Sequence, residues 1–122
     1  MTAPLNRESC RGIFAALLTP LTSDEDLDTD ACERLVHALL DEGQPGLYLT
    51  GSTGEEFAIG DAVRAAVYSV AGRAVRERGK GERLIAHVGG VPTRRALSLA
   101  RSAACCPRRR CSLRNVATQR LR

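Results

Sequence analysis

The chain has 122 residues, which suits one small domain, and 43% of them are hydrophobic, enough for a core. Aromatic residues make up only 3%, so we expect that core to be aliphatic. Residues 1–11 hold no apolar run of the signal-peptide kind, and no stretch of about 18 apolar residues could span a membrane. We therefore expect a cytoplasmic protein.

The charge is unevenly distributed along the chain. The formal net charge is +4, yet residues 1–104 carry 12 basic and 14 acidic side chains. Residues 105–122 carry six arginines and no acidic residue. The basic character therefore belongs to this tail, and the remainder has the mixed charge of an ordinary protein surface.

The cysteines fit neither a disulfide framework nor a zinc-ligand pattern. A site built on the three cysteines of the tail would lack a fourth ligand nearby. We therefore expect reduced thiols, no metal and no cofactor. The five residues are Cys10, Cys32, Cys105, Cys106 and Cys111.

The first predicted element is a strand, because the continuous apolar run at 12–18 is typical of a strand buried on both faces. Pro20 ends it. After an acidic turn, one of the polar residues 28–30 can cap a helix that Gly43 ends. The apolar face of that helix comprises Leu35, Val36, Leu39 and Leu40.

Four further elements continue the alternation of strands and helices. They are a strand at 46–50, a helix at 61–78, a strand at 84–88, and a helix from Pro92 or Thr93 to Ala104. The apolar stripe of the 61–78 helix comprises Val63, Val67, Val70, Ala74 and Val75. The order βαβαβα predicts a parallel sheet. Its repeat of 34 to 37 residues fits units of a (β/α)8 barrel, although a doubly wound sheet has similar spacing.

The loop after the second strand is a candidate anion site. In parallel α/β folds, functional loops follow the carboxyl ends of strands. Here the loop 51–55 places two hydroxyls, Ser52 and Thr53, between Gly51 and Gly54. Glycines permit close backbone approach to a ligand, so the loop suits a carboxylate. A phosphate loop would need a lysine that is absent here, and a plain turn is the remaining alternative.

Three blocks in the correct order resemble the dihydrodipicolinate synthase and N-acetylneuraminate lyase superfamily. They are Ala15-Ala16-Leu17-Leu18-Thr19-Pro20, Gly46-Leu47-Tyr48-Leu49-Thr50-Gly51-Ser52-Thr53-Gly54-Glu55, and Leu84-Ile85-Ala86-His87-Val88-Gly89. The second and third look most like the lyase branch. The resemblance covers about residues 11–104.

The resemblance implies a partial TIM barrel at 1–104, namely the first three βα units, followed by an irregular basic tail at 105–122. It implies a class I aldolase that forms a Schiff base between a lysine and pyruvate, usually as a homotetramer, with no nucleic-acid or membrane partner. The closest activity is that of an N-acetylneuraminate lyase. The alternatives are a dihydrodipicolinate synthase or a sugar-acid dehydratase.

The same resemblance assigns roles within the candidate loop. Ser52 and Thr53 would hold the carboxylate of pyruvate, and Gly51, Gly54 and Glu55 would support the loop. The family's Schiff-base lysine belongs to a sixth strand, so no residue of this chain is predicted to be catalytic.

Three residues outside the loop are predicted to have structural positions. His87 would be a packed strand histidine rather than a catalytic one, and Tyr48 would pack. The single lysine, Lys80, lies between the second helix and the third strand, on the amino-terminal side of a barrel. It is expected to be a solvated loop residue, because catalysis occurs on the opposite side.

The tail departs from the family. In the family, a fourth strand with a sequence like Gly-Ala-Asp-Ala-Val follows the third helix. Residues 105–112 of this chain show neither strand nor helix periodicity. If residues 108–112 were encoded CGG-CGC-CGA-TGC-AGT, followed by C, a frame shifted by one base would encode Gly-Ala-Asp-Ala-Val. We hypothesise that 105–122 is a frameshift product, which the nucleotide sequence can test. The alternative is an inactive fragment whose arginine-rich tail binds nucleic acid.

Overall fold

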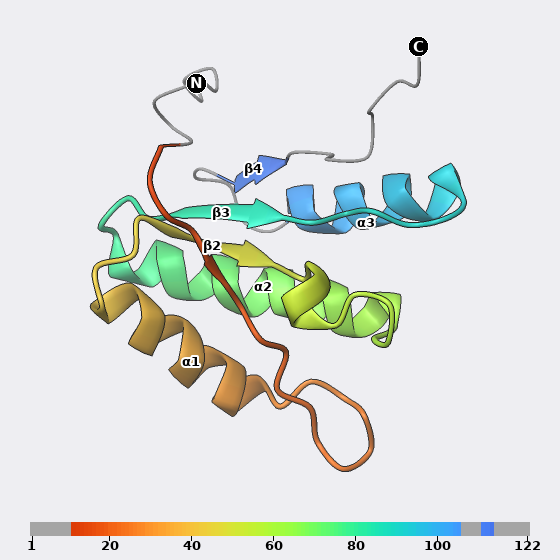
Figure 1. The fold of residues 1–122 in the computed structure, drawn as a ribbon, viewed down its shortest axis with the longest axis horizontal. Coiled ribbons are helices and arrows are strands. Elements are labelled where there is room, and N and C mark those ends of the chain that lie inside the picture. Colours follow the sequence, from red (N-terminus) through yellow and green to blue (C-terminus); the bar gives the residue numbers. More distant parts are fainter. Residues whose placement is uncertain (1–10, 106–110, 114–122) are drawn as a thin grey trace.

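The computed structural model describes residues 11–105 and 111–113, and the side chains of residues 11–104. Strands and helices alternate along the chain (Figure 1). In order they are β1 (Ala15–Ala16), α1 (Thr29–Asp41), β2 (Gly46–Leu49), the 3-10 turn η2 (Ser52–Gly54), α2 (Asp61–Arg78), β3 (Arg83–Ala86), α3 (Thr93–Cys105) and β4 (Cys111–Leu113).

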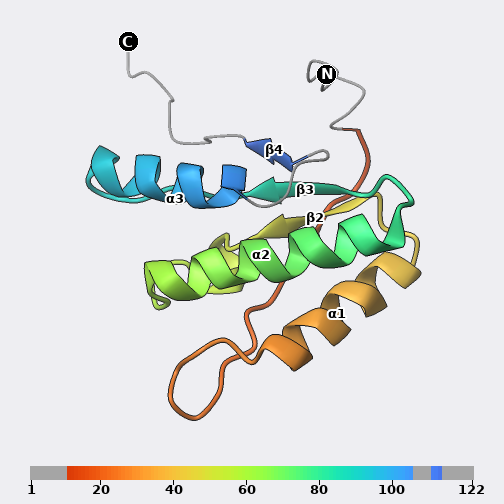
Figure 2. The same ribbon diagram turned by 180° about the vertical axis from the view of Figure 1, so that it is seen from behind.

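The four described strands form one parallel sheet in the order β1-β2-β3-β4. Each crossover advances by one strand in the same direction, and because such crossovers are right-handed, the helices collect on one face of the sheet. Figures 1 and 2 show α1 and α2 on the same side of β2; α1 packs on α2, and α2 packs on α3. A doubly wound sheet reverses its strand order and has helices on both faces, so the arrangement favours the barrel.

The strand register separates the two faces of the sheet. Leu47 lies beside Leu84, and both are buried beneath the helices. One residue further on, Tyr48 lies between Ala16 and Ile85, and this row is exposed or only half-buried. We call the face that carries this row the open face, because no described helix covers it.

The core between the sheet and the helices is aliphatic, as the composition predicts. Of the predicted stripe of α1, Val36 and Leu40 are buried, while Leu35 and Leu39 pack against the core from its edge. Other large members of the core are Leu17, Leu47, Leu49, Val67, Leu84, Val88 and Leu99.

The helix ends follow the local signals in the sequence. Asp28 caps α1 by accepting a hydrogen bond from the Ala31 backbone nitrogen at 2.9 Å. Gly43 and Gly79, just beyond α1 and α2, adopt left-handed φ angles of 83° and 64°, where a glycine avoids the strain that a Cβ would cause. None of the described helices is both long and apolar enough to cross a bilayer.

The first strand is shorter than the apolar run predicts. Only Ala15 and Ala16 pair fully with β2, although the Leu17 backbone nitrogen still donates to the Tyr48 carbonyl at 2.9 Å. Ile13, inside the predicted strand, is 80% exposed. An apolar run marks where a strand can form, but the ladder extends only where a neighbouring strand supplies partners.

The absence of strand structure predicted for the tail is wrong at residues 111–113, which pair with β3 as β4. A sheet edge offers unpaired backbone N–H and C=O groups to any extended segment, and the crossover after α3 brings the chain to that edge. Backbone pairing of this kind needs no apolar periodicity, so pattern analysis missed it. Residues 106–110 and 114–122 lie outside the described residues, and the frameshift and nucleic-acid hypotheses for them stay predictions.

Candidate functional site

The predicted Gly51–Glu55 loop lies at the carboxyl end of β2, where its middle residues form the single turn η2. Ser52 and Thr53 are exposed, whereas Gly51 and Gly54 are buried on either side of them. The two hydroxyls are therefore accessible to a ligand. The role of these loop residues in binding an anion stays a prediction.

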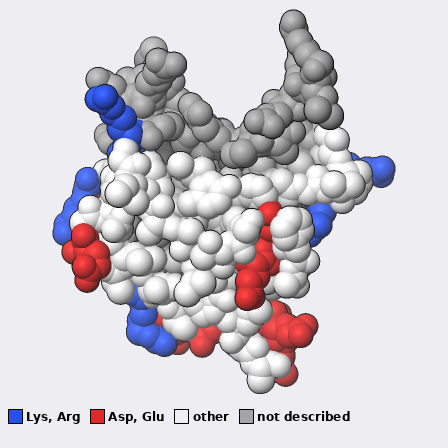
Figure 3. Space-filling view, viewed as in Figure 1, with Lys and Arg blue, Asp and Glu red and all other residues white. Residues whose placement is uncertain are grey.

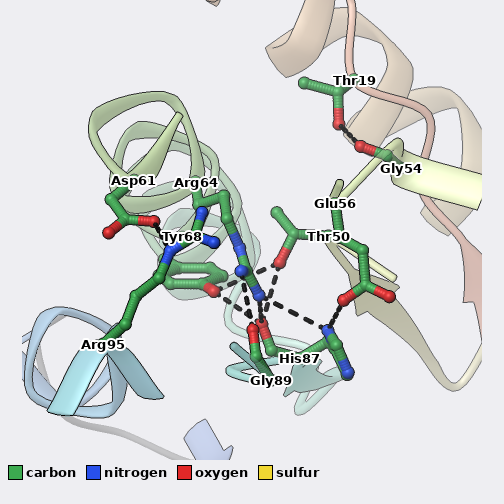
Figure 4. A network of polar contacts seen from close by, with 10 residues as sticks. All are labelled: Thr19, Thr50, Gly54, Glu56, Asp61, Arg64, Tyr68, His87, Gly89 and Arg95. Carbon is green, nitrogen blue, oxygen red and sulfur yellow. Dashed lines mark hydrogen bonds and ion pairs between the residues drawn. The ribbon is translucent and has the colours of Figure 1, made fainter. Parts of the chain in front are cut away.

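Close contacts, rather than unusual backbone angles, favour glycine at both positions. A Cβ on Gly51 would lie 2.3 Å from Cε1 of the Tyr48 ring, and a Cβ on Gly54 would lie 3.1 Å from the Leu17 carbonyl oxygen. Thr19 then fastens the loop, because its hydroxyl donates to the Gly54 carbonyl at 2.8 Å (Figure 4). A side chain at 51 would require the Tyr48 ring to shift, and one at 54 would require a smaller adjustment of the backbone at Leu17.

Glu55 supports the loop through its backbone. It has a left-handed φ of 59°, and its nitrogen donates to the Ser52 carbonyl at 3.0 Å. Its side chain is exposed, and the buried carboxylate belongs to the next residue, Glu56. The Glu56 carboxylate contacts Nδ1 of His87, which joins the loop to the segment after β3. Sequence analysis did not single out Glu56.

Thr50, the residue between β2 and the loop, has a left-handed φ of 51° and is fully buried. Such a backbone conformation costs a β-branched residue on the order of 1–3 kcal/mol, so its surroundings must hold it. Its hydroxyl lies 3.0 Å from the His87 carbonyl oxygen and 3.2 Å from the Tyr68 hydroxyl. The sharp turn into the loop is thus held from both β3 and α2.

Arg64 is the largest fully buried side chain, at 1% exposure, although sequence analysis left it out of the core. Its guanidinium donates to the Gly89 carbonyl at 2.9 Å and to the His87 carbonyl at 2.6 Å (Figure 4). The Tyr68 hydroxyl donates to the same His87 carbonyl at 2.7 Å. Together these donors fix the chain just after β3.

One sequence signal could have placed Arg64 on the buried face. It lies three and seven residues before Val67 and Ala71, which is the spacing of a single helix face. The charge of an arginine predicts a surface position, whereas its place on this helix face predicts burial. Arg64 is buried because backbone carbonyls after β3 accept hydrogen bonds from its guanidinium.

His87 follows β3 directly, and its side chain is 16% exposed. Its ring centre lies 6.2 Å from that of Tyr48, whose own ring packs under Gly51. Burial raises the pKa of the Tyr48 hydroxyl, the charge of Glu56 raises it further, and Arg64 opposes them. Tyr48 is therefore a neutral hydroxyl on the open face, next to a histidine held by a carboxylate.

Figure 3 shows a broad uncharged area on this face, with an acidic strip just right of its middle and further charged residues toward the edges. Lys80 is exposed in the turn between α2 and β3, at the amino end of the sheet and away from the loop, as predicted. Among the described residues, no group of three or more histidine, cysteine or acidic side chains could hold a metal ion.

The sequence of this chain is similar to a known protein family and to curated relatives within it. The profile of the Dihydrodipicolinate synthetase family matches residues 9–106. The N-acetylneuraminate lyase of Enterobacter sp. (strain 638) is 44% identical over 94 residues, which are 76% of this chain and 30% of that protein. The chain therefore spans about a third of the length of such curated relatives.

Solved structures agree with the sequence comparison. N-acetylneuraminate lyase from Mycoplasma synoviae superposes with a TM-score of 0.72 at 29% identity, over 81% of this chain and 33% of that one. A prophage protein of the dihydrodipicolinic acid synthase family from E. coli K12, solved in complex with pyruvate, gives 0.69 at 29% identity, over 76% and 30%. The predicted superfamily and the predicted class of fold, an incomplete (β/α)8 barrel, are confirmed.

Proposed function

Since this chain belongs to the dihydrodipicolinate synthetase family, we propose that its Gly51–Glu55 loop binds the carboxylate of pyruvate or of a related 2-keto acid. The proposed ligands are the hydroxyls of Ser52 and Thr53. The observation that carries the proposal is their exposure on a loop that is held at Gly54 by Thr19 and at Glu56 by His87. The pyruvate complex of the E. coli K12 relative supports the class of ligand.

The loop has the chemistry that a carboxylate needs. Hydroxyl groups donate hydrogen bonds to carboxylate oxygens, and the first N–H groups of a helical turn have no partner within that turn. A loop held rigidly before the ligand arrives loses less entropy on binding than a flexible one. Because the carboxylate is fixed, the neighbouring keto carbon takes a defined position over the open face.

For the whole reaction we propose a Schiff-base carbon–carbon lyase like N-acetylneuraminate lyase. In such chemistry a lysine amine condenses with the keto group, and the protonated imine withdraws electrons from the bond that breaks. The residues of this chain would supply the carboxylate site and not the amine. A dihydrodipicolinate synthase or a sugar-acid dehydratase would use the same carboxylate site, so either remains the second candidate.

The carboxylate site can be tested by adding sodium pyruvate to the 15N-labelled chain and following amide shifts by NMR. We expect the largest shifts at residues 51–55. Replacing Ser52 by Ala and Thr53 by Val together should weaken binding at least tenfold, since a hydrogen bond to a charged group contributes about 1.5–3 kcal/mol. Ser69→Ala, an exposed hydroxyl on α2, is the control. Equal binding by the double variant would refute the proposal.

The missing amine has a separate test. Incubation with pyruvate and borohydride traps a Schiff base as a stable adduct that mass spectrometry detects. We expect no adduct, because Lys80 is the single lysine and lies at the amino end of the sheet. A pyruvate adduct on Lys80 would show that the assignment of catalytic ends is wrong.

A further inference from the structure

The loop after β2 and the segment after β3 meet through one pair of side chains. The carboxylate of Glu56 contacts Nδ1 of His87, and the two side chains are 10% and 16% exposed. A further side-chain connection of the loop is the bond from Thr19 to the Gly54 carbonyl, on the side of β1. The loop is therefore fastened on both sides, and Glu56 provides the connection to β3.

The backbone of His87 cannot move independently of the sheet. Its nitrogen donates to the Leu49 carbonyl at 3.0 Å, and its carbonyl accepts from Arg64 and Tyr68. Only the imidazole remains to be oriented. The contact with the carboxylate of Glu56 holds that ring in its orientation.

The contact between Glu56 and Nδ1 favours one arrangement of hydrogens on the His87 ring. The carboxylate of Glu56 can only accept from Nδ1 if Nδ1 carries the hydrogen. An Arg64 nitrogen also lies 3.4 Å from Nδ1, but it makes its shorter bond, 2.6 Å, to the His87 carbonyl, so we give the contact with Glu56 the greater weight. Nε2 then carries the lone pair. It lies against Gly89, where a Cβ would approach it to 2.7 Å, so glycine at 89 leaves room for the ring.

We propose that Glu56, acting through His87, is a positioning residue that sets the hydroxyls of Ser52 and Thr53 for carboxylate binding. This inference rests on the proposed function of the loop. The path is contiguous: Glu56 holds the His87 ring, that ring lies beside Tyr48, and the Tyr48 ring supports Gly51 at the start of the loop. The charged groups that face the imidazole are Glu56 and Arg64, and Tyr48 is the neighbouring hydroxyl.

The experiment compares variants of the full chain in the same pyruvate titration. Glu56→Ala should weaken pyruvate binding about tenfold, which corresponds to the loss of one charge-assisted hydrogen bond. Glu56→Gln keeps an acceptor for the Nδ1 hydrogen and should recover part of the loss. His87→Asn keeps a donor near the position of Nδ1 and should bind better than His87→Ala. Glu77→Ala, which removes an exposed glutamate of α2, is the control.

A spectroscopic measurement separates positioning from general stability. The 15N shifts of the His87 ring should report hydrogen on Nδ1 in the unmodified chain, and Glu56→Ala should abolish that preference. The amides of Ser52 and Thr53 should also shift in Glu56→Ala without pyruvate, while those of α1 should not. Hydrogen on Nε2, or loop amides unchanged in Glu56→Ala, would overturn the inference.

These outcomes remain distinct from failure of the proposed function. If the unmodified chain does not bind pyruvate, the carboxylate site is wrong, and positioning is decided by the tautomer and the loop amides alone. If pyruvate binds equally to the unmodified chain and to Glu56→Ala, the site stands and the role of Glu56 is rejected.

Discussion

Two arginines of α2, one near each end of the helix, illustrate how the two ends of the sheet differ. Arg64, at the carboxyl end of the sheet, donates to the backbone carbonyls of His87 and Gly89. Arg78, at the amino end of the sheet, donates to the carboxylates of Asp41 and Glu82, both at 2.8 Å. One guanidinium fixes the segment next to the candidate site, whereas the other joins α1, α2 and the start of β3. The comparison fits a barrel whose carboxyl end serves function and whose amino end serves stability.

The backbone shows the same contrast. Among the described residues, the glycines with left-handed φ angles flank strands and helices at the amino end: Gly12, Gly43, Gly79 and Gly81. The non-glycine residues with such angles all follow a strand at the carboxyl end: Glu25, Thr50 and Glu55. A glycine adopts this conformation without a penalty, but other residues adopt it at a cost. Backbone strain therefore collects at the end of the sheet that carries the site.

The largest expected effect is that of Arg64→Met, which should lower the free energy of unfolding by about 3 kcal/mol. The change removes the hydrogen bonds that this buried, charged donor makes to the Gly89 and His87 carbonyls. Urea unfolding followed by circular dichroism measures the difference. Arg73→Met, at a surface ion pair with Glu33, should cost less than about 1 kcal/mol. If both variants lost the same free energy of unfolding, the buried arginine would contribute no more to stability than the exposed one.

The backbone contrast can be tested at Gly79. Gly79→Ala should destabilise the chain by about 1 kcal/mol, because a Cβ at a φ of 64° is strained although nothing lies within 4 Å of it. Gly79→Asn should cost less, since asparagine tolerates the left-handed region better. The same urea unfolding measures both variants. If Gly79→Ala were as stable as the original chain, the amino end of the sheet would accept a non-glycine residue in the left-handed region without a penalty, and the contrast would fail.

A smaller effect concerns the response of the amino end to acid. The hydrogen bond from Arg78 lowers the pKa of Asp41 below 3.8. At Glu82 burial would raise the pKa, but its bonds, led by that of Arg78, lower it below 4.5. A lowered pKa in the folded state contributes stability above the unfolded pKa and loses it as pH falls through the folded value. The unfolding free energies of the original chain and of Arg78→Gln should therefore differ at neutral pH and begin to converge as the pH falls below about 4. If the two unfolding free energies differed by the same amount at every pH, Arg78 would not be the cause of the lowered pKa values.

The smallest effect is spectroscopic and concerns Tyr48. Burial and the charge of Glu56 raise its pKa above 10.0, so its hydroxyl should stay protonated at a pH where an exposed tyrosine ionises. Glu56→Gln removes one of the two causes and should lower that pKa toward 10.0. Titration of the Tyr48 ring carbons by NMR measures it, with Glu77→Gln as the control. No change in Glu56→Gln would mean that the carboxylate does not act on this hydroxyl.

Local signals in the sequence were sufficient for the helices and for the position of the loop. The helix predicted at 61–78 has those bounds in the structure, because the end of a helix depends on nearby residues such as Gly79. The loop is where the pattern placed it, since two glycines and two hydroxyls after a strand are a local feature. The parallel sheet followed from the alternation of strands and helices.

Only the tertiary structure decided which polar side chains are buried and what they hold. Glu55 and Glu56 are the same residue type and cannot be distinguished by sequence pattern. The left-handed turn at Glu55 directs the side chain of Glu56 inward, where it contacts His87. Arg64 is buried because carbonyls 23 and 25 residues later in the chain accept its N–H groups. Strand β4 exists because the edge of β3 was open to it. Each of these depends on partners distant in the sequence, whereas helix periodicity and capping depend only on neighbours, and that is why the sequence determined the elements but not their polar contacts.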